Sequence, residues 1–416
     1  MEVQFVVFVM FVIVASSSCL CVRLTSDDLS HSFNVLDYGA VGNGKNDESR
    51  AFMDAWKDAC SAIYESSTLL IPKEKTFMLQ PMWFMGPCNS PTIYVKLEGI
   101  IIAPSTIEAW KWPNENDRGS WIRFSEIRGL VIYGGGLIDG KGAPWWDCYS
   151  NAMCESENPT ALHFHACENL ILRGLTHINS PRNHISLNAC HGSRISKLHI
   201  IAPNESPNTD GIDIAESTNV IIENSKMETG DDCIAINHGS TSIDIVGIFC
   251  GPGHGISVGS LGRNGAEESV EKIYVRNCTF NRTTNGARIK TWMVKFIFLH
   301  GDIKGGNGYA RKVTFEDIIL IEANNPVIID QEYNPYDSLY GNGVKVSDVT
   351  FRNIRGTSIS KHAIQLHCDG SISCTNIILE GINITSSIGD EVHASCKNVN
   401  GICTSCIPYV PCLSQE

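Results

Sequence analysis

The chain has 416 residues, of which 43% are hydrophobic and 19% are charged, as in a well-packed globular protein rather than a disordered one. Its formal net charge of -13 at pH 7 argues against broad nucleic-acid binding, which needs a basic face. An acidic ligand stays compatible with this charge, because a local pair of cations can hold a carboxylate inside a negative protein.

The N-terminus predicts a secretory signal. An apolar run from Phe5 to Ala15 is followed by small residues, and it is too short for a membrane span. We therefore take residues 1–21 as a signal peptide and expect the mature protein to be secreted.

The cysteines agree with export. Of 17 cysteines, those other than Cys19 and Cys21 would remain in the mature chain, an odd number that predicts disulfides and a free thiol. No two CxxC pairs are matched as in a zinc site, and CTSC at 403–406 is read as part of a disulfide-bonded tail. Asn-X-Ser/Thr sequons, which predict a glycoprotein, occur at Asn204, Asn277, Asn281 and Asn383.

Residues 47–63, DESRAFMDAWKDACSAI, have apolar residues at helical spacing. A helix here would cap the open end of the fold that follows, because an unpaired strand edge would otherwise template aggregation.

A repeat then runs along the chain: a polar start followed by a short strand with alternating apolar residues. Copies in the central part begin about 24 to 29 residues apart, a period typical of stacked coils. The copies lie at 129–135, 169–175, 194–201, 219–225, 243–249, 272–278, 312–318, 348–354 and 376–382.

Stacked coils bury a continuous core that one coil cannot bury alone. The repeat therefore predicts an all-β, single-domain, right-handed parallel β-helix over residues 33–416. A propeller needs blades of roughly 40 residues, and the leucine spacing of a leucine-rich horseshoe is not matched. The step from Lys272 to Lys312 is too long by about a dozen residues for this period, and the excess coincides with an out-of-pattern apolar stretch at 293–304.

Acidic residues recur at the period of the repeat. Asp210 and Asp213 lie one coil before the adjacent pair Asp231 and Asp232, and His254 follows one coil later, 22 residues after Asp232 (254 − 232). In a parallel solenoid, residues one period apart stack on one face. Each residue alone has an ordinary explanation, such as a solvated turn or a structural histidine, but the alignment of all five predicts a site.

Two cations occupy the following coil. Arg288 and Lys290 are separated by one residue, a spacing that points both to one face of a strand. Hydrolysis of a glycosidic bond needs a protonated carboxyl for the leaving oxygen and a carboxylate to activate water. Crowded acids raise one another's pKa, so one of them can keep its proton. A cation pair fits a negatively charged sugar.

Four short blocks carry a resemblance to a known family. NTD at 208–210, GDD at 230–232, GHG at 253–255 and RIK at 288–290 resemble the signature blocks of polygalacturonases, and their flanks resemble the plant-type members. The similarity covers nearly the whole chain from Phe33 onward. It implies a right-handed β-helix that hydrolyses α-1,4 bonds between galacturonic acids in pectin with inversion, in the plant cell wall.

The resemblance also implies residue roles. Asp231 is the general acid, Asp210 and Asp232 hold and deprotonate the water, and His254 tunes the protonation of the acid.

Substrate contacts follow from the same resemblance. Arg288 and Lys290 bind the substrate carboxylate, and Tyr333 in IIDQEY resembles a substrate-binding tyrosine of the family. No metal or cofactor is implied. We expect a monomer whose partner is pectic polysaccharide, with no nucleic acid or membrane.

The resemblance further implies the disulfides Cys233–Cys250, Cys60–Cys88 and Cys368–Cys374. Two departures stand out. The extra stretch at 293–304 interrupts a family segment that usually runs directly from RIKTW into a glycine pair, and Asn334 replaces a cysteine that the family tends to have after the tyrosine.

Other functions stay open at this stage. The chain is expected to act on plain galacturonan, with endo action favoured over exo action. The alternatives are a hydrolase of a substituted galacturonan and a weakly active or non-catalytic wall protein that binds pectin. A pectate lyase would need a calcium cluster and an arginine base.

Overall fold

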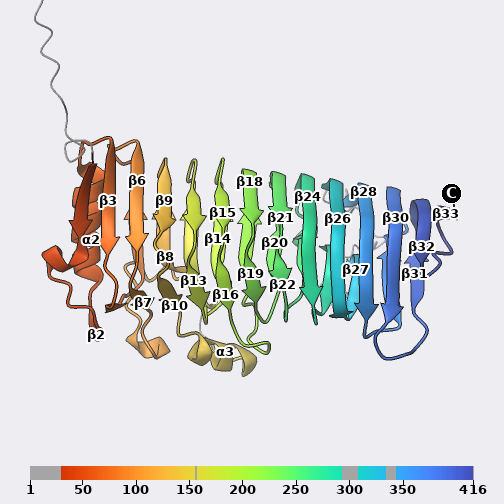
Figure 1. Cartoon of the computed structure of the whole chain (residues 1–416), viewed down its shortest axis with the longest axis horizontal. Helices are drawn as coiled ribbons and strands as arrows, with labels where there is room; N and C mark the ends of the chain where they lie inside the picture. The colour runs from red at the N-terminus through yellow and green to blue at the C-terminus, as the bar shows by residue number, and fades with distance from the viewer. Residues whose placement is uncertain (1–29, 155–156, 293–307, 334–342, 416) are drawn as a thin grey trace, which may run out of the picture.

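The computed structural model describes residues 30–154, 157–292, 308–333 and 343–415 (Figure 1). The predicted signal peptide at 1–21, the extra stretch at 293–304 and Asn334 lie outside these residues. Among the described helices, none is both long and apolar enough to cross a membrane.

The strands form a right-handed parallel β-helix, which confirms the fold predicted from the repeat (Figure 1). One sheet of 11 strands runs along the described part of the molecule. Its strands are β5 (Met82–Met85), β8 (Ser120–Ser125), β11 (Thr160–His165), β14 (Ile185–Asn188), β17 (Ile212–Ala215), β20 (Ile234–Ile236), β23 (Ile256–Leu261), β25 (Asn285–Trp292), β27 (Asn325–Tyr333), β29 (His362–His367) and β31 (His393–Lys397).

The second sheet begins as two rows of short strands. The first row is β1 (Ser30–Asn34), β3 (Ser66–Ile71), β6 (Thr92–Leu97), β9 (Leu130–Tyr133), β12 (Ile171–Arg173), β15 (Arg194–Ser196), β18 (Thr218–Glu223) and β21 (Thr241–Val246). The second row is β2 (Asn43–Asp47), β4 (Thr76–Met78), β7 (Ile100–Ile102), β10 (Leu137–Asp139), β13 (Thr176–Ile178), β16 (His199–Ile201), β19 (Lys226–Glu228) and β22 (Phe249–Cys250).

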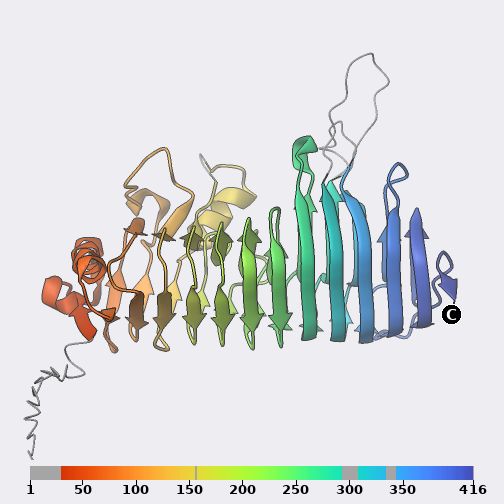
Figure 2. The same cartoon turned by 90° about the horizontal axis from the view of Figure 1, so that it is seen from above.

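The two rows merge in the C-terminal half, where each coil carries one long strand (Figure 2). These strands are β24 (Ser269–Asn281), β26 (Tyr309–Ala323), β28 (Lys345–Ser358), β30 (Cys374–Ser386) and β32 (Val399–Ile407), followed by the short β33 (Ser414–Gln415).

From the coil of β12 and β13 onward, the backbone bends at a residue in the left-handed conformation, either between the two short strands of a coil or within its one long strand. Glycine, asparagine and aspartate tolerate this backbone conformation best, which explains why they recur at this step of the repeat. The bending residues are Gly174, Lys197, Asn224, Gly247, Asn277, Asp317, Asn353, Gly381 and Ser405.

The long step from Lys272 to Lys312 closes one coil without a loss of register. Ile273 of β24 pairs with Val313 of β26, and Ala287 of β25 pairs with Val327 of β27. The strands on both sides of 293–307 are therefore stacked like the others.

The predicted N-terminal helix is present as α2 (Ser49–Ser61). Its buried face, which includes Phe52 and Trp56, packs against the first coils, and a Cys60–Cys88 disulfide ties it there. The sequence did not predict the second α-helix, α3 (Ala143–Ser150), nor the short turns η1 (Val35–Tyr38), η2 (Ile107–Ala109) and η3 (Arg263–Gly265).

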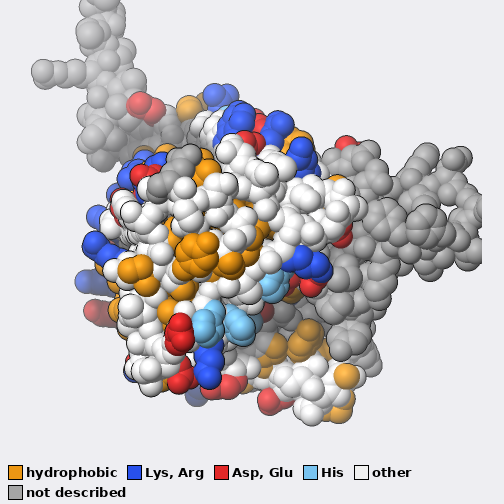
Figure 3. Space-filling view, turned by 90° about the vertical axis from the view of Figure 1, so that its right-hand side faces the viewer, with side chains coloured by type: hydrophobic (Ala, Val, Ile, Leu, Met, Phe, Trp, Pro, Cys, Tyr) orange, Lys and Arg blue, Asp and Glu red, His pale blue; other side chains and the backbone are white. Residues whose placement is uncertain are grey.

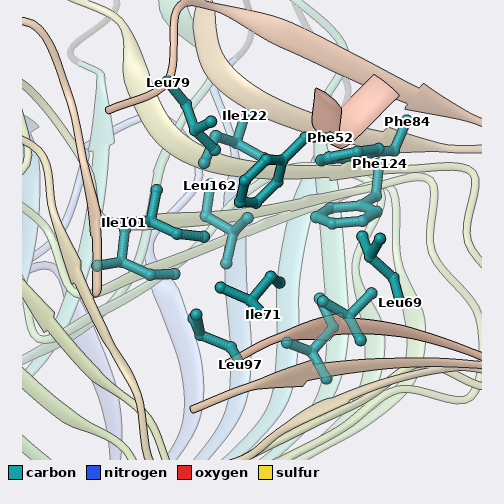
Figure 4. A pocket seen from close by; sticks show the side chains of 13 residues that line it. Phe52, Leu69, Ile71, Leu79, Phe84, Leu97, Ile101, Ile122, Phe124 and Leu162 are labelled. Carbon is teal, nitrogen blue, oxygen red and sulfur yellow. The ribbon is translucent and has the colours of Figure 1, made fainter. Parts of the chain in front are cut away.

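The interior is a column of stacked apolar side chains. Phe84, Phe124 and Phe164 stack from coil to coil with ring centroids 4.7 and 5.6 Å apart. A void of about 30 Å³ lies in the N-terminal coils, and Figure 4 shows that only apolar side chains, such as Phe52 and Leu69, line it. A water would find no polar partner there, so we read this void as a packing gap and not a ligand site.

The three disulfides implied by the resemblance are formed: Cys60–Cys88, Cys233–Cys250 and Cys368–Cys374. Further pairs are Cys148–Cys154, Cys396–Cys412 and Cys403–Cys406. Among the described cysteines, the unpaired ones are Cys167, Cys190 and Cys278, and all are buried.

The last coil ends in a partly apolar surface. Figure 3 looks onto this C-terminal end, where hydrophobic side chains gather beside histidines and charged residues. Ile407 and Tyr409 are exposed there and line a shallow depression with Val392 and His393.

Candidate active site

The adjacent acids lie in a turn and not on a strand. Asp231 and Asp232 connect β19 to β20, and the backbone N–H of Asp232 donates to Oδ1 of Asp231 at 2.9 Å. This bend lets both carboxylates reach one site, although one is buried and the other is partly exposed. The Asp232 side chain is 0% exposed and that of Asp231 is 19% exposed.

The predicted stacking of the acids and the histidine at a 22-residue period (232 − 210) is confirmed by the strand register. Ile212 of β17 pairs with Ile234 of β20, which pairs with Ile256 of β23. Asp210 precedes the first of these strands and His254 precedes the last. The turns that carry them therefore lie one coil to either side of the acid pair.

His254 binds Asp231 directly. Its Nδ1 lies 2.7 Å from Oδ1 of Asp231, and its backbone N–H donates to the Asp231 carbonyl at 2.7 Å. Nδ2 of Asn208 lies 3.3 Å from Oδ2, the second oxygen of Asp231. The carboxyl of Asp231 is therefore held from both sides while it stays partly open to solvent.

Asp232 is the centre of a buried charge cluster with Arg288 and Lys290. A guanidinium nitrogen of Arg288 lies 2.6 Å from Oδ1, and Nζ of Lys290 lies 2.8 Å from Oδ2. Both cations project from the same face of β25, as their spacing predicted. Their side chains are only 10% exposed, and two cations against one carboxylate leave the cluster with one net positive charge.

The acids differ in their electrostatics. Burial, reinforced by the negative charge of Asp213, raises the pKa of Asp210 well above its usual range. Burial also raises the pKa of Asp213 to about 7. For Asp232 burial acts in the same direction, but the charges of Arg288 and Lys290 outweigh it and lower the pKa. The site therefore contains one carboxylate that is kept ionised and two carboxyls that hold their protons in mild acid.

Tyr333, which the resemblance implies to bind substrate, lies beside Lys290. Nζ of Lys290 is 5.3 Å from the centre of the Tyr333 ring, which itself packs edge-to-face on Trp292 at 5.5 Å. A cation over an aromatic face is attracted by the ring, so Tyr333 helps to fix the direction of Lys290.

Two residues to which the sequence analysis assigned no role complete the cluster. Ser257 donates to Oδ1 of Asp232 at 2.9 Å and accepts from Nε of Arg288 at 2.7 Å. Asn208 supports Asp231. Ser257 could have been found from the strand pairing, because Ser257 of β23 lies opposite Arg288 of β25.

Three ligand atoms of metal-binding type come close together here. One atom each of Asp231, Asp232 and His254 lie within 4.8 Å of one another. Arg288 and Lys290 already occupy both oxygens of Asp232, and their charge repels a cation. The donor set therefore fits acid and base chemistry better than metal binding.

A family model described as glycosyl hydrolases family 28 matches residues 60–406 of the chain. A probable polygalacturonase of Arabidopsis thaliana is 44% identical over 392 residues, which cover 92% of this chain and 81% of that protein. A polygalacturonase of Gossypium hirsutum is 39% identical over 392 residues, covering 92% and 91%.

Among solved structures, an endo-xylogalacturonan hydrolase of Aspergillus tubingensis matches with a TM-score of 0.75. It is 27% identical, and the match covers 90% of this chain and 99% of that one.

Proposed function

The chain belongs to glycosyl hydrolase family 28, and on that premise we propose that it hydrolyses α-1,4 bonds between galacturonic acid residues of pectin. The observation that carries this proposal is the connected cluster of Asp231 with His254 and of Asp232 with Arg288 and Lys290. A protein that only binds pectin would have no need to keep one carboxylate ionised beside protonated ones.

Asp231 serves as the general acid. It is the carboxyl of the pair that is open to solvent, so a glycosidic oxygen can reach it. Its hydrogen bond to Nδ1 of His254 gives it a partner that replaces the proton after transfer.

Asp232 serves as the base for the attacking water. Its two cationic neighbours keep it ionised. A water held between Asp232 and the protonated Asp210 then attacks the anomeric carbon, which inverts its configuration.

Arg288 and Lys290 bind the carboxylate of a galacturonic acid residue. The net positive charge of their cluster attracts a uronate and favours it over a methyl ester. Tyr333 holds Lys290 in place and lies next to the bound sugar.

The proposed action is endo. Outward-facing side chains form one continuous row across the 11-stranded sheet, on both sides of the cluster. In strand order the row is Trp83, Arg123, His163, Ser186, Asp213, Ala235, Ser257, Arg288, Ile328, Gln365 and Ser395. The proposal is that a polymer lies along this row and extends past the acids in both directions, with a step of about 4.8 Å per strand.

The proposed site of action is the cell wall, where the protein works as a monomer after export. Its disulfides are stable in the oxidising environment outside the cell. The exposed sequon residues Asn204, Asn277 and Asn383 are accessible for glycosylation.

Resolution of product sizes over time tests the endo assignment. Incubation of purified protein with polygalacturonate should release reducing ends and give oligomers of mixed length early in the reaction. Release of a single short product from the first minutes onward would show exo action, and no release of reducing ends would contradict the proposed hydrolysis.

A further inference from the structure

A fully buried histidine lies directly behind Asp210. His184 precedes β14 and is 0% exposed. Its backbone N–H donates to the Asp210 carbonyl at 2.8 Å, and its ring Nδ1 lies 3.1 Å from the same oxygen. One residue thus approaches the Asp210 carbonyl with two nitrogen atoms.

The contacts of the ring bear on its tautomer. Burial lowers the pKa of His184 to about 4, so the ring is neutral in mild acid and has one donor and one acceptor. Nε2 lies 3.4 Å from the backbone N–H of Ser180, which can only donate, and 3.3 Å from the Ile201 carbonyl. The Asp210 carbonyl can only accept and is the closer of the two carbonyls, at 3.1 Å against 3.3 Å for Ile201, so the proposal takes the proton on Nδ1, with Nε2 accepting from Ser180.

The orientation of the Asp210 side chain depends mainly on the position of its own backbone. Among the described residues, the Asp210 carboxyl forms no hydrogen bond with another side chain, and Asp210 lies in the turn before β17 and not on a strand. Ile201, beside Nε2 of His184, ends strand β16 at the other end of that turn. The imidazole therefore contacts both ends of the turn that carries Asp210.

We propose that His184 is a positioning residue for the hydrolysis, which fixes the Asp210 carbonyl and with it the direction of the Asp210 carboxyl. This inference rests on the proposed function, in which Asp210 holds the attacking water. A shift of about 1 Å in such a group can cost on the order of 100-fold in rate, so a hydrogen bond to a backbone atom can matter to catalysis.

A second buried histidine supplies a matched control. His177 packs edge-to-face on His184 with ring centroids 5.0 Å apart and is 3% exposed. Neither of its ring nitrogens has a hydrogen-bond partner among the described residues. His177 therefore packs against His184, and its ring forms no hydrogen bond to Asp210.

The test compares two amides that imitate different ring nitrogens. The amide nitrogen of His184→Asn lies where Nδ1 was and can still donate to the Asp210 carbonyl, whereas that of His184→Gln takes the place of Nε2. On polygalacturonate we expect the Gln variant to lose roughly 10- to 100-fold in kcat, with little change in KM. The Asn variant and the His177→Phe control should stay close to the parent in kcat, whatever their melting temperatures.

Each outcome decides the matter. Equal kcat for the Asn and Gln variants, or an equal loss in His177→Phe, would overturn the positioning role while an active parent leaves the proposed function intact. An inactive parent would overturn both. If His184→Gln does not fold, the Asn variant decides alone: kcat near the parent supports the inference, and a loss above about tenfold overturns it. Failure of both to fold would make His184 a folding residue and also overturn it.

Discussion

The two sheets of this β-helix each carry a network of acidic and basic side chains, and the two networks differ in burial. On the long strands of the second sheet, Glu316, Arg352 and Glu380 stack at one register and form a partly exposed surface ladder. On the 11-stranded sheet, Asp232 is fully buried between Arg288 and Lys290.

This difference in burial separates charges that only contribute to the surface from charges that serve binding or catalysis. Exposed ion pairs contribute about 0–1 kcal/mol, and salt screens them. A buried carboxylate instead costs several kcal/mol to desolvate, which its partners must offset. The ladder is therefore replaceable, whereas the cluster makes sense only if its fixed charges serve a ligand or a reaction.

The largest effect should come from the proton donor beside the buried cluster. Asp231→Asn keeps the shape of the side chain but removes the acid, which typically costs on the order of 100- to 10,000-fold in rate. Turnover of polygalacturonate is the measurement, with Glu316→Gln in the surface ladder as the control that stays active. More than a tenth of parental turnover in the Asn variant would show that Asp231 is not the acid.

The next effect is on stability. Asp232→Asn leaves Arg288 and Lys290 without their counter-charge, and breaking a buried pair in this way costs about 3–5 kcal/mol. Chemical denaturation should show this loss together with a loss of activity. A variant as stable as the parent would mean that the two cations find other partners, and the contrast with the ladder would fail.

Removal of one cation should change substrate choice. Lys290→Ala deletes a charge that faces Asp232 and, in the proposal, the substrate carboxylate. The transition state should lose about 2 kcal/mol of stabilisation, so kcat/KM on polygalacturonate should fall roughly 30-fold. The preference for de-esterified over methylated galacturonan should disappear as well. Kinetics equal to those of the parent would remove Lys290 from the site.

The protonated carboxyls predict a pH effect. Because burial raises the pKa of Asp213 from 3.8 to about 7, the folded state binds a proton between these values that the unfolded state has released. The free energy of unfolding therefore falls as pH rises through this window. Melting temperatures of Asp213→Asn should fall less steeply from pH 4 to pH 7 than those of the parent, and those of the surface variant Asp244→Asn should follow the parent. Equal slopes for Asp213→Asn and the parent would contradict the assignment.

The smallest effect belongs to the surface ladder. Arg352→Gln breaks two exposed ion pairs, so we expect a loss of at most about 1 kcal/mol and no change in activity. Denaturation at low and high salt measures it. A loss as large as that of Asp232→Asn would show that burial does not separate the two networks.

The sequence predicted the fold and the stacking of the site because both follow from periodicity. A 22-residue spacing fixes which residues lie on neighbouring coils, and it placed His254 next to Asp231 correctly. Alternation along β25 likewise put Arg288 and Lys290 on one face.

Periodicity does not determine the direction of side chains within turns. The binding of the substrate carboxylate by the two cations stays a prediction, and the spacing did not reveal that both also pair with Asp232 across two coils. Ser257 was missed because a serine in a glycine-rich segment has no distinguishing pattern until its neighbours are known. The bend that turns Asp231 and Asp232 to one site depends on a local hydrogen bond that spacing cannot reveal.

The configuration of the new reducing end tests the central claim most directly. Asp231 and Asp232 have oxygens within 4.8 Å, shorter than the roughly 6.5–9.5 Å usual for inverting enzymes, yet the ion pairs of Asp232 with Arg288 and Lys290 make it a poor nucleophile towards the sugar. Proton NMR during hydrolysis of oligogalacturonate should show the β-anomer first, before mutarotation. Initial appearance of the α-anomer would mean a covalent intermediate on a carboxylate, and the proposed division between acid, base and water would be wrong.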